Sequence, residues 1–97
     1  MKYLIVDANL GGTGIRDTYN GGYIELNSLS LSEVLKRKIN NWLKNYHEEH
    51  YKGYLNLITI ENLDKEGIKL AKDIKKELGE VKVEYFSDAK LIKQIII

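Results

Sequence analysis

The residues whose types and spacing suggest chemistry lie in positions 7–22, which read DANLGGTGIRDTYNGG. This stretch holds five of the chain's eight glycines and lies between two apolar runs. Glycine adopts backbone conformations that other residues avoid, so the composition predicts an exposed loop of unusual shape. Such a loop either surrounds a phosphate group with backbone N–H groups or presents side chains to a protein partner. Residue types alone leave both interpretations open.

The phosphate interpretation meets two obstacles in the spacing. A P-loop requires Gly-x-x-x-x-Gly-Lys followed by Ser or Thr, and no Lys-Ser or Lys-Thr follows these glycines. The dinucleotide motif requires Gly-x-Gly-x-x-Gly, and Asp17 stands in place of the third glycine, where its carboxylate would repel a pyrophosphate. A small ligand- or nucleotide-binding domain or enzyme that uses the Gly11–Gly14 loop therefore remains only the alternative hypothesis. No cofactor is expected.

An excess of tyrosine favours partner recognition, because the chain has seven tyrosines and one phenylalanine. Tyrosine combines an apolar ring with a hydroxyl that stays in water, and tyrosine and arginine are enriched among the residues that dominate protein–protein binding energy. The predicted partner-binding set combines two charged loop residues with tyrosines near expected loops and strand ends: Arg16, Asp17, Tyr19, Tyr23 and Tyr85.

Neither a catalytic set nor a metal site is predicted. Residues 47–50 (HEEH) differ from the zinc-protease motif H-E-x-x-H because their histidines are three positions apart rather than four. We expect a solvated helix end there, with His50 partly on the core side. Asp7 and Asp17 would converge for acid–base chemistry only if the first two strands pair, and aspartate is common in turns for other reasons. We therefore expect a protein that is not an enzyme.

The bulk composition indicates one domain over residues 1–97. A net charge of +1 argues against a dedicated nucleic-acid binder, which usually carries a basic excess. No apolar run approaches the ~18 residues that span a bilayer, and the first apolar run is too short for a signal peptide. We expect a cytosolic protein that has no membrane partner.

The elements that must position these residues can be predicted from the pattern. We expect strands near 2–8, 23–26, 81–86 and 91–97. Ser30 with Glu33 fits a capping box that begins a long amphipathic helix reaching residue 50. Residues 54–60 fit a strand or a helix, and we assign a short strand followed by a helix over 62–78 that Gly79 ends. Gly67 inside that helix suggests close packing on the sheet, since it costs ~1 kcal/mol against alanine.

This element order predicts an α+β fold in which two helices pack on one face of a small, mainly antiparallel sheet of about four to five strands. The last three residues are all isoleucine, so the final strand should be paired or covered rather than left as an adhesive edge. A homodimer that pairs through this C-terminal strand is a third hypothesis, and the oligomeric state stays open.

Three segments carry a family resemblance: residues 12–17 (GTGIRD), 63–68 (LDKEGI) and 83–88 (VEYFSD). Together with the helix that bears Trp42, they resemble small immunity proteins encoded beside polymorphic toxins, including those of bacterial contact-dependent growth inhibition. The resemblance covers most of the chain. It implies a cytosolic antitoxin that binds a delivered toxin domain, often a nuclease, and blocks its active site or substrate surface. Many nuclease-blocking members are acidic mimics of nucleic acid, and this chain, at +1, departs from that pattern.

Overall fold

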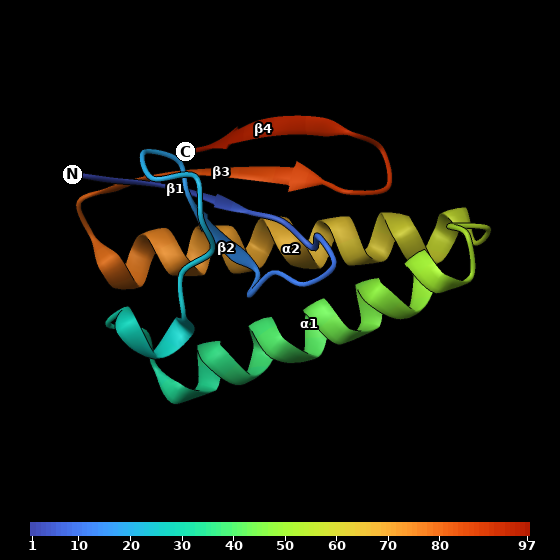
Figure 1. Cartoon of the computed structure of the whole chain (residues 1–97), viewed down its shortest axis with the longest axis horizontal. Coiled ribbons are helices and arrows are strands. Elements are labelled where there is room, and N and C mark those ends of the chain that lie inside the picture. Colours follow the sequence, from blue (N-terminus) through green and yellow to red (C-terminus); the bar gives the residue numbers. More distant parts are fainter.

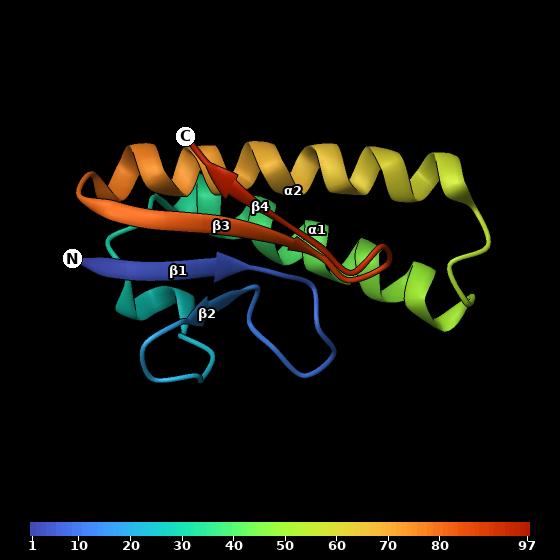
Figure 2. The same cartoon turned by 90° about the horizontal axis from the view of Figure 1, so that it is seen from above.

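The computed structural model describes residues 1–97. The order of elements is β1 (Lys2–Val6), β2 (Ile15–Asp17), the 3-10 turn η1 (Leu26–Ser28), α1 (Glu33–Tyr51), α2 (Leu57–Leu78), β3 (Val81–Ser87) and β4 (Ile92–Ile96). Both helices lie on the same face of the sheet, and no helix covers the opposite face (Figures 1 and 2). The predicted α+β architecture is therefore confirmed.

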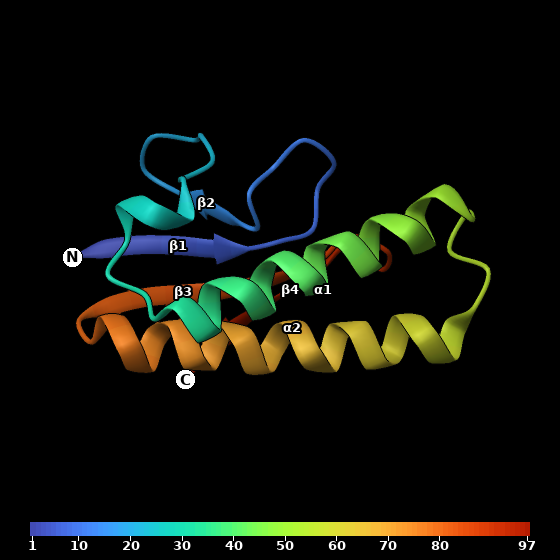
Figure 3. The same cartoon turned by 90° about the horizontal axis from the view of Figure 1, so that it is seen from below.

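The four strands form one sheet in the order β2-β1-β3-β4. The outer pairs β1–β2 and β3–β4 are antiparallel, and the central pair β1–β3 is parallel. The helical hairpin explains the parallel pair. α1 leads away from the end of the sheet where β1 begins and α2 returns to it, so β3 starts beside the start of β1 (Figure 3).

The second strand lies inside the glycine-rich segment rather than at 23–26, so that prediction is wrong. Tyr23 makes only an isolated bridge with Arg16, and the chain then enters η1. Leu4 is the partner of Asp17 in the β1–β2 register, while the Asp7 amide bonds to the Gly14 carbonyl. Asp7 and Asp17 therefore lie at opposite ends of this strand pair and do not converge.

Helix α1 begins two residues later than the capping box predicts. The Ser32 hydroxyl, not that of Ser30, accepts a hydrogen bond from the Leu35 amide at 3.1 Å, and it donates to Glu77 at 2.9 Å. Leu29 and Leu31 are buried in the core, which keeps residues 29–31 out of the helix and moves the cap to the next serine.

Helix α2 includes most of the segment that we assigned to a short strand, so the strand over 54–60 is wrong. The Asn56 side chain accepts a hydrogen bond from the Thr59 amide at 3.0 Å and begins the helix. This cap outweighs the strand preference of the β-branched residues that follow. The helix ends as predicted, with Gly79 at a φ of 79°.

The core fills the space between the sheet and the two helices. Gly67 of α2 lies directly against the ring of Tyr85 on β3, as the sequence predicts for a close approach of helix and sheet. β4 is paired with β3 on one side only and forms an edge of the sheet; Ile96 is buried, whereas Ile95 and Ile97 are exposed. Neither helix has the length and apolar character that crossing a bilayer requires.

Candidate functional site

Arg16, Tyr23 and Asp7 form a rigid cluster where β1 ends. The Arg16 guanidinium donates to the Tyr23 hydroxyl at 2.8 Å and lies 3.2 Å from the Asp7 carboxylate, to which the Tyr23 hydroxyl also donates at 2.7 Å. Asp7 is 2% exposed, so its charge depends on these partners. The hydrogen bond to Tyr23 and the charge of Asp7 raise the pKa of Arg16. The structure thus brings together two of the predicted residues, with the Arg16 side chain about a third exposed.

Asp17 and Tyr19 form the exposed turn beyond β2. The Asp17 carboxylate accepts hydrogen bonds from the Asn20 side chain and from the Tyr19 amide, and these bonds lower its pKa. This pattern is an Asx turn, which shapes the loop without help from the core. The Tyr19 ring is 70% exposed and meets the Tyr3 ring edge-on at a centroid distance of 6.0 Å. Asp17 therefore positions the turn, and Tyr19 is its accessible apolar side chain.

Two glycines of this segment serve packing. A Cβ added to Gly12 would lie 2.5 Å from the Tyr23 ring, and one added to Gly14 would lie 3.0 Å from Ile39 of α1. After these glycines the chain enters β2 rather than a helix N-terminus, the element that phosphate-binding loops require. The glycines let the loop pack on Tyr23 and α1 and so hold Arg16 in place.

Tyr85 lies apart from the other predicted residues. It is 2% exposed on the helix-facing side of β3, and its hydroxyl donates to the Asp64 carboxylate at 2.6 Å. Burial and this carboxylate raise the pKa of Tyr85. Tyr46 and Ser87 also donate to Asp64, at 2.9 and 2.8 Å, so the cluster joins α1, α2 and β3. Because Tyr85 stabilises the core, we remove it from the binding set.

The uncovered face of the sheet carries exposed cations above buried carboxylates. Glu84 lies on this face nearly fully buried, where the Tyr3 hydroxyl donates to it and Lys93 lies 3.8 Å away. Lys93 is 58% exposed, and the Lys82 ammonium lies 4.6 Å from the centre of the Tyr3 ring. An approaching molecule therefore meets positive groups first.

A shallow pocket of about 390 Å³ opens on the same face, at the end where β1 and β3 finish. Its lining is half apolar and half charged. We call it the sheet-face pocket, lined by Ile5, Asp7, Arg16, Phe86, Leu91 and Lys93.

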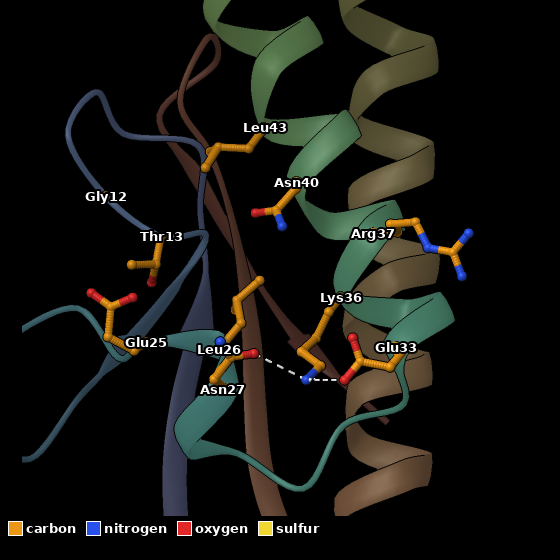
Figure 4. A pocket seen from close by; sticks show the side chains of 10 residues that line it. All are labelled: Gly12, Thr13, Glu25, Leu26, Asn27, Glu33, Lys36, Arg37, Asn40 and Leu43. Carbon is orange, nitrogen blue, oxygen red and sulfur yellow. Dashed lines mark hydrogen bonds and ion pairs between the residues drawn. The ribbon is translucent and has the colours of Figure 1, made fainter.

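A second hollow of about 390 Å³ lies between the glycine loop and α1 (Figure 4). The Lys36 ammonium donates to the side-chain Oδ1 of Asn27 at 3.0 Å and forms an ion pair with Glu33 at 2.7 Å, so it closes one end of the hollow. Arg37 points away from it, while Asn40 points inward. Three of its polar side chains, Asn27, Lys36 and Glu33, are thus paired with one another, and the Thr13 hydroxyl donates to the Ile24 carbonyl.

The histidines do not behave as the pattern predicts. His47 is the half-buried one, with Nε2 2.9 Å from the Ala8 carbonyl, whereas His50 is exposed and contacts the Tyr54 hydroxyl at 3.1 Å. No group of three or more His, Asp or Glu side chains is placed to hold a metal ion. His47 instead connects α1 to the segment after β1.

Sequence reasoning missed the uncovered sheet face. Its signal was the alternation of β1 and β3, which places every second residue on one side. The alternation alone does not show that residues of β1 and β3 share a face, because this requires the two strands to be neighbours. Once they are paired, the face contains Tyr3, Ile5, Lys82, Glu84 and Phe86.

Comparison with known sequences identifies the family of the chain. A search of curated proteins finds no significant match. The sequence profile of a family described as Serratia CdiI immunity protein-like matches residues 4–88, which confirms the resemblance read from the three segments. Since the match runs from β1 through β3, the protein belongs to the Serratia CdiI immunity protein-like family.

Proposed function

We propose that this protein binds a cognate toxin domain in the cytosol and neutralises it by forming a stoichiometric complex. Membership of the immunity family, over residues 4–88, is the observation that carries this proposal. The mechanism is steric: the bound protein covers the surface that the toxin needs for its substrate and performs no chemistry. A nuclease is the toxin activity to assay first.

We place the recognition surface on Arg16, Asp17, Tyr19 and Tyr23 and on the adjoining uncovered face of the sheet. A stable interface buries roughly 1,600 Å² in total, which is more than one loop provides. Arg16 is held by Asp7 and Tyr23 before any partner arrives, so little side-chain entropy is lost when it binds. Tyr19 supplies an exposed aromatic anchor beside it.

The test is co-expression with the toxin domain encoded immediately upstream. We expect the two chains to co-purify in a one-to-one complex and the toxin domain to stop growth of cells that lack this protein. A toxin domain that neither binds the protein nor harms such cells would refute the proposal.

A pair of matched variants locates the surface. Tyr19→Ala is expected to weaken binding about 10- to 30-fold, because an exposed aromatic anchor is lost. Tyr51→Ala is the control, since Tyr51 is also a tyrosine, is 78% exposed, and lies at the end of α1, in a different element from Tyr19. Equal affinity of the two variants would remove the loop from the interface.

A further inference from the structure

On the uncovered sheet face the positive groups are more exposed than the negative groups. Two carboxylates of this face, Asp7 and Glu84, are buried and already accept hydrogen bonds from tyrosine hydroxyls. A third carboxylate, that of Asp88, is partly buried near Asp7 and Arg16. Its cations stay at the surface: Lys93 is more than half exposed and Arg16 about a third. The Lys93–Glu84 separation of 3.8 Å is long for an ion pair. The exposed part of the Arg16 guanidinium faces outward from its bonds to Asp7 and Tyr23. Lys93 and the exposed part of Arg16 are therefore the positive groups that a partner can reach on this face.

Leu91 contributes an independent observation at the rim of the sheet-face pocket. Its backbone φ is 58°, in the left-handed region that disfavours leucine, and its side chain is 73% exposed. Asparagine or glycine would fit that backbone better and would not expose an apolar side chain to water. A residue that is unfavourable for folding on both counts points to a role in binding.

We propose that the toxin surface recognised by this protein is acidic, and that one of its carboxylate side chains enters the sheet-face pocket between Arg16 and Lys93 while a neighbouring apolar residue packs on Leu91 and Phe86. This inference rests on the proposed function and names the chemistry of its partner. The pocket is lined by two cations, by three apolar side chains and by Asp7, whose carboxylate is already paired with Arg16 and Tyr23. This combination matches a partner carboxylate that lies beside an apolar residue.

A protein segment fits this pocket better than a nucleic acid does. Nucleic-acid surfaces present rows of basic residues and aromatic rings on which bases stack. Here the net charge is +1, and Tyr3, the aromatic residue beside Lys82, is already covered by that lysine and by Tyr19. A face with cations outermost also does not imitate a phosphate backbone. The contact made by this pocket is therefore expected on an acidic part of the toxin surface beside its substrate site, and access of the substrate is blocked by the bulk of the bound protein rather than by mimicry of a nucleic acid.

The experiment measures the affinity of the purified protein for its toxin domain by calorimetry. Lys93→Glu is expected to weaken binding by at least about 30-fold, because it places a like charge opposite the toxin carboxylate. Lys44→Glu is the matched control: Lys44 is exposed on α1, makes no ion pair, and should change affinity by less than about threefold. Raising the salt concentration should weaken binding of the wild type more than of Lys93→Gln.

Leu91→Asn separates binding from folding. Asparagine tolerates a positive φ, so we expect the melting temperature to rise by about 5 °C while affinity falls at least about tenfold. A destabilised protein gives the opposite change in melting temperature, so misfolding cannot imitate this result. Unchanged affinity of Leu91→Asn would remove the apolar contact from the proposal.

The outcomes distinguish the two proposals. If the wild-type protein binds the toxin and Lys93→Glu binds equally well or more tightly, the acidic-partner inference is wrong and the immunity function stands. If the wild-type protein neither binds the toxin domain nor protects cells from it, both the proposed function and the acidic-partner inference are wrong. Fluorescence anisotropy measures binding of single- and double-stranded oligonucleotides to the wild type and to Lys93→Glu. If the wild type binds an oligonucleotide tightly and Lys93→Glu does not, the sheet-face pocket binds a nucleic acid and the inference is wrong.

Discussion

Gly67 of α2 and Tyr85 of β3 are packed without room for one additional carbon atom. A Cβ at position 67 would overlap Cε1 of Tyr85 and would lie 2.7 Å from its hydroxyl oxygen. The ring cannot move aside easily, because its hydroxyl is bound to Asp64 and its side chain is buried. This contact sets the separation between α2 and the sheet, and it makes the position specific for glycine.

Gly67→Ala is therefore expected to destabilise the protein by about 2 kcal/mol, even though alanine is the better helix former by ~1 kcal/mol. Overpacking against Tyr85 outweighs the gain in helix propensity. Chemical denaturation of the variant measures the effect. Glu66→Ala, at an exposed neighbouring position on the same helix, is the control and should change stability by less than ~0.5 kcal/mol. A stabilised Gly67→Ala protein would contradict this packing.

Tyr85→Phe tests the buried carboxylate that joins the two helices to the sheet. Removing the hydroxyl leaves the nearly buried Asp64 carboxylate with one donor fewer. We expect a loss of about 2 kcal/mol in the free energy of unfolding, because hydrogen bonds to charged groups contribute about 1.5–3 kcal/mol. Tyr51→Phe, on an exposed ring, should have no effect. Equal stability of both variants would mean that Asp64 does not need this bond.

The start of α1 gives a direct comparison of two serines. Ser32→Ala removes the acceptor for the Leu35 amide and the bond to Glu77, and it should cost about 1 kcal/mol or slightly more. Ser30→Ala should be nearly neutral, because Ser30 precedes the helix and is exposed. Thermal melts of both variants decide between the observed cap and the capping box suggested by the sequence. A larger loss for Ser30→Ala would refute the observed helix start.

Asp88 gives a pH-dependent prediction. Burial and the neighbouring Asp7 carboxylate raise the pKa of Asp88 above its ordinary value of 3.8. At pH values between the unfolded and folded pKa, the folded state binds more protons, so the free energy of unfolding decreases as pH rises through that interval. Asp88→Asn should therefore raise the melting temperature at pH 7, with a smaller difference near pH 3, where the wild-type group is protonated.

Glu48→Gln controls for the change in net charge, since Glu48 is exposed on α1. It should change the melting temperature little at either pH. If Asp88→Asn instead lowers the melting temperature at pH 7, then attraction of the Asp88 carboxylate to His47 and His50, which act to lower its pKa, outweighs its desolvation.

The sequence by itself determined the fold class, the end of the second helix at Gly79, and the family. These depend on local signals. Apolar spacing over many turns indicates a helix, and glycine after the last turn indicates its end. Short segments such as residues 12–17 indicate the family from their residue types alone. The prediction at Gly67 also succeeded, because a glycine in a helix interior is locally unfavourable and so indicates a close contact.

Tertiary structure decided what local signals leave ambiguous. Residues 15–17 become a strand only because β1 is beside them, and Ser32 becomes the cap because Leu29 and Leu31 are needed in the core. Whether Tyr85 faces a partner or Asp64 depends on which side of β3 the helices cover. The uncovered face likewise exists only once distant strands pair, since the register between β1 and β3 brings together residues about 80 positions apart, as with Tyr3 and Lys82.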